Sequence, residues 1–374
     1  MKITASIIIP VRNNLEFTRN CLKSIRDTAE GIDYEIIVID NASDDGSSDM
    51  LKDEADNGKL KHIYNEQPRH FAASCNQGAE TACGDYLVFL NNDIVAKDGW
   101  LREMMVVAEK SPDVGAVGAK LLYPDGTIQH AGVAFHYFES LGQFRPYHLF
   151  RTFPADSETV NKVREFQAVT GACMLTPASV FQEIGGFDEG YVNCFEDIDY
   201  CLHLGAKGLK IIYAPQAELI HYEGQTKGRN DNVDHSCSLL MSKWSGKVYC
   251  DDYDIVQGEG YLLRVTDDFN LCIHPGDEIR DWHQAILQLV ELKQFRMALD
   301  EIDKIGRVIG GSKVSLHKLK GKCHLELGES EEAKLAFARA MAVDPEDTEA
   351  RWGLEQVGLK EEDRGVALKS GLSF

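Results

Sequence analysis

The chain has 374 residues, of which 44% are hydrophobic and 26% are charged, so global disorder is excluded and two or three domains are expected. Asp and Glu outnumber Lys and Arg by 60 to 39, and the formal net charge of -21 disfavours nucleic acid or an anionic membrane as a partner of the whole surface. No apolar run is long enough for a membrane helix, and the N-terminal run is too short for a signal peptide. We therefore expect a cytoplasmic protein whose ten cysteines are mostly reduced.

The first 90 residues alternate between β-branched runs and segments whose apolar residues have helical spacing. This periodicity predicts strands over residues 5–10, 35–40, 61–64 and 86–90 and helices over residues 15–28, 50–57 and 71–83. Such alternation is typical of an α/β fold with a mostly parallel central sheet.

Polar residues follow the predicted strands at residues 12–14, 40–46 and 91–93. In a parallel sheet the carboxyl ends of the strands line one edge, and ligands bind there. Asp40, Asp45 and Asp93 would then share one crevice, where a cation or hydrogen-bond donors must offset their charge. The sequence therefore predicts a metal-bound nucleotide at this edge.

The middle of the chain continues the same α/β pattern. It predicts strands over residues 114–122, 168–176 and 210–213 and helices over residues 177–184 and 197–204. The aromatic-rich segment 135–153 shows no clear periodicity and is expected to be a long loop, either a surface excursion or a lid over the site.

Beyond about residue 279 the composition becomes helical. Residues 314–345 carry small and aromatic residues at the spacing of one tetratricopeptide unit, which are Gly321, Gly328, Ala333, Phe337, Ala340 and Pro345. Weaker helical patterns flank this unit on both sides. The expected domains are 1–255, a linker 256–280 and a helical domain 281–374 that either binds a protein partner or serves as a cap or dimerisation module.

Six segments of the chain resemble, in order, the motifs of the family 2 glycosyltransferases of the GT-A fold, and the rhamnosyltransferase-like branch fits best. The segments are SIIIPVRN (6–13), VIDNASDDGS (38–47), NQG (76–78), FLNND (89–93), GGFD (185–188) and FEDID (195–199). The resemblance covers about residues 4–245. It implies the inverting transfer of one sugar from a UDP-, dTDP- or GDP-linked donor to a hydroxyl of a glycan, lipid-linked or protein acceptor, with Mn²⁺ or Mg²⁺ as cofactor.

The resemblance also implies which residues bind the nucleotide. They are Pro10, Val11, Arg12, Asp40, Asn41, Asn76, Gly78, Asn91 and Asn92. Asp40 would accept hydrogen bonds from the base, or would only cap the turn that follows it. Asn76 and Gly78 would approach the nucleotide, or would only pack their helix against its neighbours.

Asp93 stands where the family has the last residue of its Asp-x-Asp-type motif, so the resemblance makes it a metal ligand. His221 resembles the histidine that supplies a second metal contact, although a structural role is the alternative. Asn91 and Asn92 replace possible carboxylates. Since they lower the charge of the site, the metal is expected to bind best together with the nucleotide.

The pair Glu196 and Asp197 resembles the acidic pair under the family's acceptor site, with Asp197 as general base. Acids in the first turn of a helix could instead only favour its dipole. Contacts to the donor or acceptor sugar are expected from Trp100, His130, Thr170, Gly171 and Lys227. Lys227 or Arg229 would offset the charge of the leaving diphosphate, while a core role for Trp100 and a buried strand around Thr170 are the alternatives.

The chain lacks the Gln-x-x-Arg-Trp motif of processive polysaccharide synthases, which favours transfer of one sugar over polymer extrusion. Two other functions stay open. One is an interaction protein that recruits partners through its helical tail. The other is a sugar-nucleotide nucleotidyltransferase, for which a Gly-rich loop and a Lys should follow the first strand, and neither does.

Overall fold

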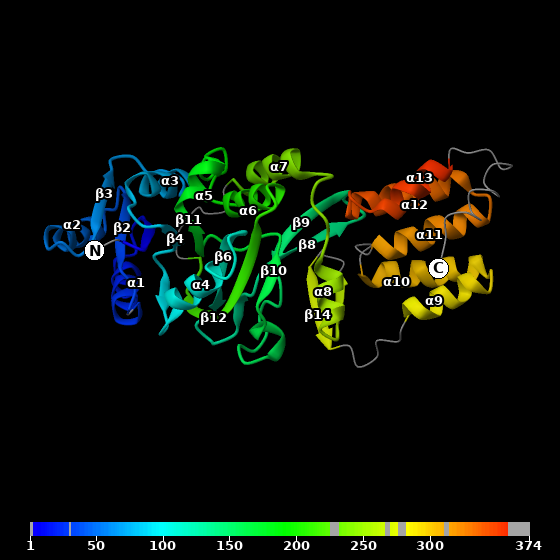
Figure 1. Cartoon of the computed structure of the whole chain (residues 1–374), viewed down its shortest axis with the longest axis horizontal. Coiled ribbons are helices and arrows are strands. Elements are labelled where there is room, and N and C mark those ends of the chain that lie inside the picture. The colour runs from blue at the N-terminus through cyan, green and yellow to red at the C-terminus, as the bar shows by residue number, and fades with distance from the viewer. Residues whose placement is uncertain are drawn as a thin grey trace. The chain divides into compact units, whose positions relative to one another are not determined.

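The computed structural model describes residues 3–29, 31–224, 232–265, 270–275, 282–309 and 314–357. The chain divides into two compact units. The first unit consists of residues 1–134 and 148–240, and the second of residues 135–147 and 241–374. Figure 1 shows a sheet flanked by helices in the first unit and a mainly helical second unit.

A ten-stranded mixed sheet forms the centre of the first unit. Its strands are β1 (Ala5–Val11), β2 (Tyr34–Asn41), β3 (Lys61–Asn65), β4 (Tyr86–Leu90), β5 (Ile94–Ala96), β6 (Val114–Leu122), β7 (Ile128–His130), β10 (Arg164–Phe166), β11 (Cys173–Pro177) and β12 (Lys210–His221). The main order is β10-β12-β6-β11-β4-β1-β2-β3, with β5 paired to β12 and β7 to β6. Along this order only β11 and β10 run against the others, so the predicted α/β fold with a mostly parallel sheet is confirmed.

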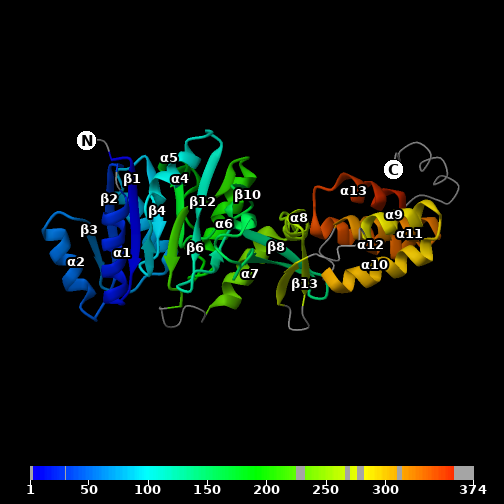
Figure 2. The ribbon, with the colours of Figure 1, turned by 90° about the horizontal axis from the view of Figure 1, so that it is seen from below.

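Helices cover both faces of this sheet (Figures 1 and 2). They are α1 (Leu15–Thr28), α2 (Ser47–Asp56), α3 (Phe71–Thr81), α4 (Trp100–Ala108), α5 (Ala178–Ile184), α6 (Glu196–Ala206) and α7 (Val233–Trp244), with a 3₁₀ turn over Glu158–Asn161. Successive residues of a strand point to opposite faces. Accordingly, Ile7 and Ile9 join the core under α1 and α4, whereas Ile8 faces α3.

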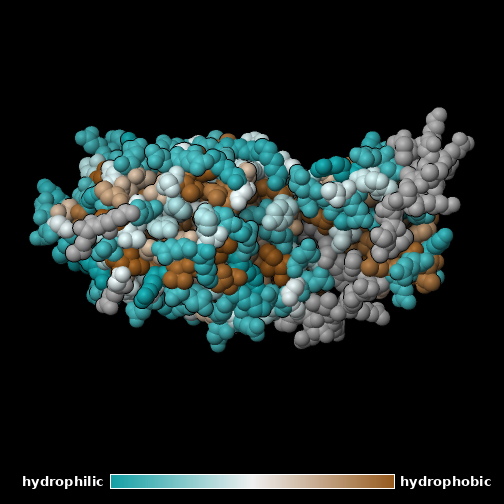
Figure 3. All heavy atoms as spheres, in the orientation of Figure 1, coloured by the Kyte–Doolittle hydropathy of each residue, from teal (hydrophilic) through white to brown (hydrophobic). Residues whose placement is uncertain are grey.

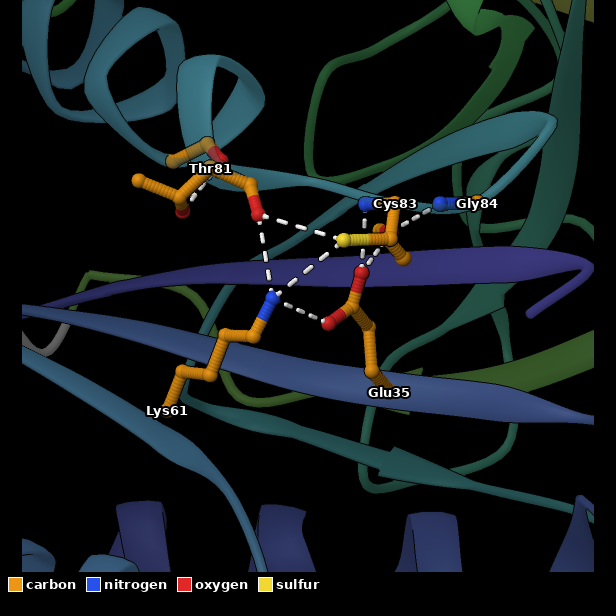
Figure 4. A network of polar contacts seen from close by, with 7 residues as sticks. Glu35, Lys61, Thr81, Cys83 and Gly84 are labelled. Carbon is orange, nitrogen blue, oxygen red and sulfur yellow. Dashed lines mark hydrogen bonds and ion pairs between the residues drawn. The ribbon is translucent and has the colours of Figure 1, made fainter. Parts of the chain in front are cut away.

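A polar network ties the sheet together at the amino ends of its parallel strands (Figure 4). Glu35 Oε1 accepts the Cys83 N–H at 2.6 Å, and Glu35 Oε2 lies 2.7 Å from Lys61 Nζ. Lys61 Nζ also donates to the Thr81 carbonyl at 3.0 Å. Burial raises the pKa of Glu35, but the contacts with Lys61, Ser6 and Cys83 outweigh it and lower the pKa below its ordinary value. The network therefore stabilises the edge opposite to the carboxyl ends of the strands.

The predicted long loop over residues 135–153 is wrong. The structure places two paired strands there, β8 (Val133–Phe138) and β9 (Gln143–His148). Nearly every residue of β8 is buried, so no alternation of polar and apolar residues marks it as a strand in the sequence.

Two other strands differ from their predicted bounds. β11 begins at Cys173 rather than at residue 168. β12 continues to His221 although residues 210–213 alone were predicted, because Pro215 interrupts the pattern. Pro215 lies where the register of β12 shifts against β6, between Ala214 and Glu218, which is a position that tolerates a proline. The longer strand carries its C-terminal end to the edge where the predicted ligands lie.

The second unit contains β8 and β9 and the C-terminal elements. These are α8 (Asp252–Gly258), β13 (Tyr261–Val265), β14 (Leu271–Pro275), α9 (Trp282–Glu291), α10 (Phe295–Ile309), α11 (Val314–Glu326), α12 (Ser330–Val343) and α13 (Thr348–Val357). The buried His136 Nδ1 lies 2.7 Å from Asp252 Oδ2, and Glu139 pairs with Arg339 at 2.5 Å. These contacts attach the β8–β9 pair to the C-terminal elements of the same unit.

The predicted helix-turn-helix over residues 314–345 is helical as expected, with α11 and α12 packed through the small and aromatic positions. A Cβ atom on Gly321 would lie 2.7 Å from the Phe337 ring, and one on Gly353 of α13 would lie 2.4 Å from it. Glycine at both positions lets the three helices approach one ring.

Three further expectations from composition can be compared with the structure. No helix within the described ranges is long and apolar enough to cross a membrane. The ten cysteines are free thiols, as predicted. The face shown in Figure 3 is covered mainly by hydrophilic residues, in agreement with the strongly charged composition.

Candidate active site

A cavity of about 420 Å³ opens in the first unit at the carboxyl ends of the parallel strands. Its volume falls in the range of small-molecule sites. The cavity is lined by Pro10, Val11, Arg12, Asn41, Pro68, Arg69, His70, Phe71, Asn91, Asn92, Asp93, Thr170, Gly171, Ala172, Val192, Asn193, Glu196, Asp197, Gly224 and Asn232. The predicted edge of the sheet is therefore the edge that carries the cavity.

Asp93 lines this cavity, and His221 contacts Asp93 although it is not itself among the lining residues. His221 pairs with Ile94 of β5 at the end of β12, and its Nε2 lies 3.1 Å from Asp93 Oδ1. The Tyr222 N–H donates to the Asp93 carbonyl at 3.0 Å and holds the two segments together. Both side chains are largely buried.

This pair has the geometry of two ligands of one hard divalent cation. Ligand atoms at about 2.1 Å from an ion and at right angles lie about 3 Å apart, which matches the observed separation. Among the described residues no group of three or more His, Cys, Asp or Glu side chains could hold a metal. Any ion bound here would need further oxygen ligands beyond this pair.

The two asparagines before Asp93 differ in role. Asn91 Nδ2 lies 3.3 Å from His221 Nε2, on the side that faces Asp93. Asn92 Nδ2 donates to Thr18 Oγ1 at 2.9 Å, which ties the turn to α1. The Asn91 side chain therefore lies with Asp93 and His221, whereas the Asn92 side chain holds the backbone of this turn against α1.

Asp197 lies at the start of α6, beside the glycine of the Thr170–Ala172 turn. The Gly171 N–H donates to Asp197 Oδ2 at 2.6 Å, and the Ile198 N–H donates to Oδ1 at 2.8 Å. A Cβ on residue 171 would lie 3.1 Å from the Asp197 Cβ, so glycine permits this close approach. Each carboxylate oxygen can accept two hydrogen bonds, so Asp197 keeps acceptor positions for a substrate hydroxyl.

A turn with two residues in the left-handed backbone region precedes Glu196 and Asp197 and positions them at the cavity. Asn193 and Phe195 have φ angles of 58° and 71°, in the left-handed region that a bulky residue rarely adopts. The Asn193 Oδ1 accepts the Phe71 N–H at 3.0 Å and so joins this turn to the start of α3. Strain of this kind is concentrated at functional sites.

Cationic side chains form another part of the wall. Arg12 was predicted here, whereas Arg69 and His70 were not. In the part of the chain that the structure describes, neither Arg12 nor Arg69 makes an ion pair. Two unpaired guanidinium groups at the cavity of a protein with a net charge of -21 favour an anionic ligand. The sequence signal was a basic Pro-Arg-His stretch immediately before a predicted helix.

Asp40 and Asp45 do not line the cavity, so the expectation that they share one crevice with Asp93 is corrected. Asp40 is fully buried, and it accepts the Ser43 N–H at 3.0 Å and the Ser48 hydroxyl at 2.6 Å. Asp45 accepts the Leu15 N–H at 3.0 Å. Asp40 thus stabilises the turn that leads into α2, and Asp45 stabilises the start of α1. A contact between Asp40 and a base stays a prediction.

The buried Asp40 should make stability depend on pH. Burial raises its pKa, but His62, Ser43 and Ser48 outweigh it and lower the pKa from 3.8 to about 2. Since the folded-state pKa is depressed, the stabilisation of about 2 kcal/mol is present above pH 4 and is lost as the pH falls toward 2. Asp40→Asn should therefore destabilise the protein at pH 7, and the difference from wild type should shrink at pH 3.5. Thermal melts with the exposed Asp44→Asn as control measure this, and an equal difference at both pH values would contradict it.

Asn76, Gly78 and Trp100 also lie outside the cavity lining. Asn76 exchanges two hydrogen bonds of 2.9 Å with the backbone of Phe187. A Cβ on Gly78 would lie 2.5 Å from Ile8 Cγ2, so this glycine allows α3 to pack on β1. Trp100 is fully buried in the core. The structure gives these residues packing contacts, and their contacts with a ligand stay predictions.

His130 is buried behind the cavity wall. Burial and His148 lower its pKa to about 3, so the ring is neutral at pH 7. Its Nδ1 lies 2.8 Å from the Ala119 carbonyl, and its Nε2 accepts the Thr170 N–H at 3.3 Å. His130 thus holds the turn that contacts Asp197. Lys227 and Arg229 lie outside the described residues.

Comparison with known proteins agrees with this arrangement. Residues 6–184 match the family described as Glycosyl transferase family 2. Over residues 6–184 the chain is thus similar to family 2 glycosyltransferases. The motifs that line the cavity up to Ala172 fall inside the matched range, whereas Glu196, Asp197 and His221 follow it.

Curated proteins similar to this chain include the O-antigen biosynthesis protein RfbC of Myxococcus xanthus, 32% identical over 225 residues, or 59% of this chain. The match covers 17% of RfbC, so the chain spans less than a fifth of that relative. The N-acetylglucosaminyl-diphospho-decaprenol L-rhamnosyltransferase of Mycobacterium tuberculosis (strain ATCC 25618 / H37Rv) is 24% identical over 210 residues, which are 52% of this chain and 68% of that protein.

Among solved structures, GalNAc-T7 with UDP, GalNAc and Mn²⁺ has a TM-score of 0.51 with 15% sequence identity. The alignment covers 66% of this chain and 51% of GalNAc-T7. At this identity the likeness concerns the fold alone, and it confirms the GT-A type of the first unit.

Proposed function

We propose that this chain is a metal-dependent inverting glycosyltransferase that moves one sugar from a nucleoside-diphosphate sugar to a hydroxyl of a glycan, lipid-linked or protein acceptor. One observation carries the proposal: Asp93, which contacts His221, and the carboxylate of Asp197 line the same cavity, and Asp93 lies in the range that matches family 2. The Asp93–His221 pair would provide two ligand atoms for a cation that binds diphosphate. Asp197 would provide a base for the acceptor hydroxyl.

The donor would place its diphosphate near Asp93 and its nucleoside toward the ends of β1 and β2. A Mn²⁺ or Mg²⁺ ion held by Asp93 Oδ1 and His221 Nε2 would neutralise the charge of the diphosphate as it leaves. Arg12 and Arg69 line the same cavity and attract the anionic donor independently of the metal.

Asp197 would act on the acceptor. Its carboxylate removes the proton of the acceptor hydroxyl while that oxygen attacks the anomeric carbon from the face opposite to the diphosphate. The new carbon–oxygen bond forms as the bond to the diphosphate breaks, and the configuration at the anomeric carbon inverts. The N–H groups of Gly171 and Ile198 hold the carboxylate in place during this step.

Calorimetric titration with UDP, dTDP, GDP and CDP tests the proposal, each in Mn²⁺ and in EDTA. The expected result is binding of one nucleotide that depends strongly on Mn²⁺, which also identifies the donor class for an acceptor screen. Failure of all four nucleotides to bind would contradict the proposal and would favour the alternative of an interaction protein.

A further inference from the structure

We propose that Gln129 is a positioning residue that fixes the tautomer of His221, so that the Nε2 lone pair points toward Asp93. Gln129 lies in the middle of β7, and its side chain is buried. Its Oε1 lies 3.0 Å from His221 Nδ1, on the opposite side of the ring from Asp93. The metal part of this inference rests on the proposed function, whereas the tautomer does not.

The chemistry of the amide decides the tautomer. An amide oxygen only accepts hydrogen bonds, so His221 Nδ1 must carry the proton and donate it to Gln129. In the neutral ring Nε2 is then unprotonated and free to accept. It lies 3.1 Å from Asp93 Oδ1 and 3.3 Å from Asn91 Nδ2.

The orientation of the Gln129 amide is itself fixed by Glu223. The Glu223 side chain makes a hydrogen bond with the Gln129 side chain. A carboxylate only accepts, so the amide nitrogen of Gln129 must face Glu223 and the amide oxygen must face His221. Arg151 Nη2 lies 3.3 Å from Glu223 Oε2 and holds that carboxylate in turn.

The backbone of β7 is held from two sides. β7 pairs with β6, and the Ile128 carbonyl accepts the Thr152 N–H at 2.7 Å. His148 Nδ1 lies 2.9 Å from the Gln129 carbonyl. The backbone of β7 is therefore held in place. From it the Gln129 side chain contacts His221, and the adjacent His130 side chain contacts the Thr170 turn.

Without Gln129 the metal pair would have a competing state. His221 could carry its proton on Nε2 and donate it to Asp93 Oδ1, since 3.1 Å is an ordinary hydrogen-bond distance. That hydrogen bond would occupy both ligand atoms. A residue that accepts a hydrogen bond from the ring nitrogen that does not bind the metal typically contributes roughly 10- to 100-fold to metal affinity.

The tautomer is measured first, in the metal-free protein. Nitrogen NMR of ¹⁵N-histidine-labelled full chain, with the His221 signals assigned by their loss in His221→Gln, should show a proton on Nδ1. Gln129→Met should move the proton to Nε2. An unprotonated Nδ1 in the wild type would overturn the inference without reference to any variant or metal.

Metal affinity is measured second, by Mn²⁺ paramagnetic resonance in the presence of the nucleoside diphosphate that binds best in calorimetry. Gln129→Met should weaken Mn²⁺ binding roughly 10- to 100-fold. The exposed Gln182→Met serves as the matched control. Unchanged tautomer and affinity in a folded Gln129→Met would refute the positioning role. A wild type that has the expected tautomer but binds no Mn²⁺ would instead count against the proposed function.

Discussion

Asp197→Asn should reduce sugar transfer by roughly 10²- to 10⁴-fold, the usual contribution of a general base, while nucleotide affinity stays within a few-fold of wild type. Asparagine has nearly the same shape and keeps one acceptor for a backbone N–H, but it cannot take a proton from the acceptor hydroxyl. The effect should therefore fall on turnover and not on binding. Turnover is measured with the donor identified by calorimetry and an acceptor found in the subsequent screen.

Asp234→Asn is the matched control for this change. Asp234 also lies in the first turn of a helix, α7, but it is exposed and does not line the cavity. It should transfer sugar at the wild-type rate. Near-full turnover by Asp197→Asn would show that another group removes the proton, and Glu196, which lines the same wall, would be the next residue to test.

Asp93→Ala should weaken nucleotide binding in Mn²⁺ by roughly 10- to 100-fold or more, because it removes one of the two protein ligand atoms of the cation. In EDTA the wild type and the variant should bind the nucleotide equally weakly, since the difference between them comes only from the metal. Calorimetry of both proteins, in Mn²⁺ and in EDTA, separates the two cases.

Asp98→Ala provides the comparison for charge alone. Asp98 is exposed, lies five positions further along the chain and does not line the cavity. Its removal should leave Mn²⁺-dependent binding unchanged. A loss of binding by Asp93→Ala that is just as large in EDTA would mean that Asp93 supports the fold of the cavity and does not hold a cation.

Much of the first unit was predictable because its signals are local. The strands β1, β2 and β4 are continuous apolar runs between polar turns, and α1 was predicted with its observed bounds. The motif that ends in Asp93 was found because it follows a predicted strand, and the acidic pair at the start of α6 was found through its resemblance to a family motif. The predicted crevice edge and the α/β fold are therefore properties that the amino-acid sequence determines by itself.

Other features depend on which segments meet in space. His221 reaches Asp93 only because β12 continues past Pro215 and pairs with β5, a contact between residues more than a hundred positions apart. The roles of Gln129 and His130 have the same origin, since a three-residue strand has no periodicity to detect and its partners lie on β12 and in the Thr170 turn. The strand β8 was missed because nearly all of its residues are buried.

The sequence thus determined the order of the elements, the type of fold and the two acidic motifs, because hydrophobic periodicity and short motifs act over a few residues. Only the tertiary structure decided which carboxylates reach the cavity. It placed Asp40 under a turn, where burial and hydrogen bonds occupy it, and it brought Arg69 to the lining of the cavity that Asp93 and Asp197 also line. These outcomes depend on long-range packing and on which hydrogen-bond donors reach each carboxylate. Neither can be predicted from the residues that are adjacent to the carboxylate in the sequence.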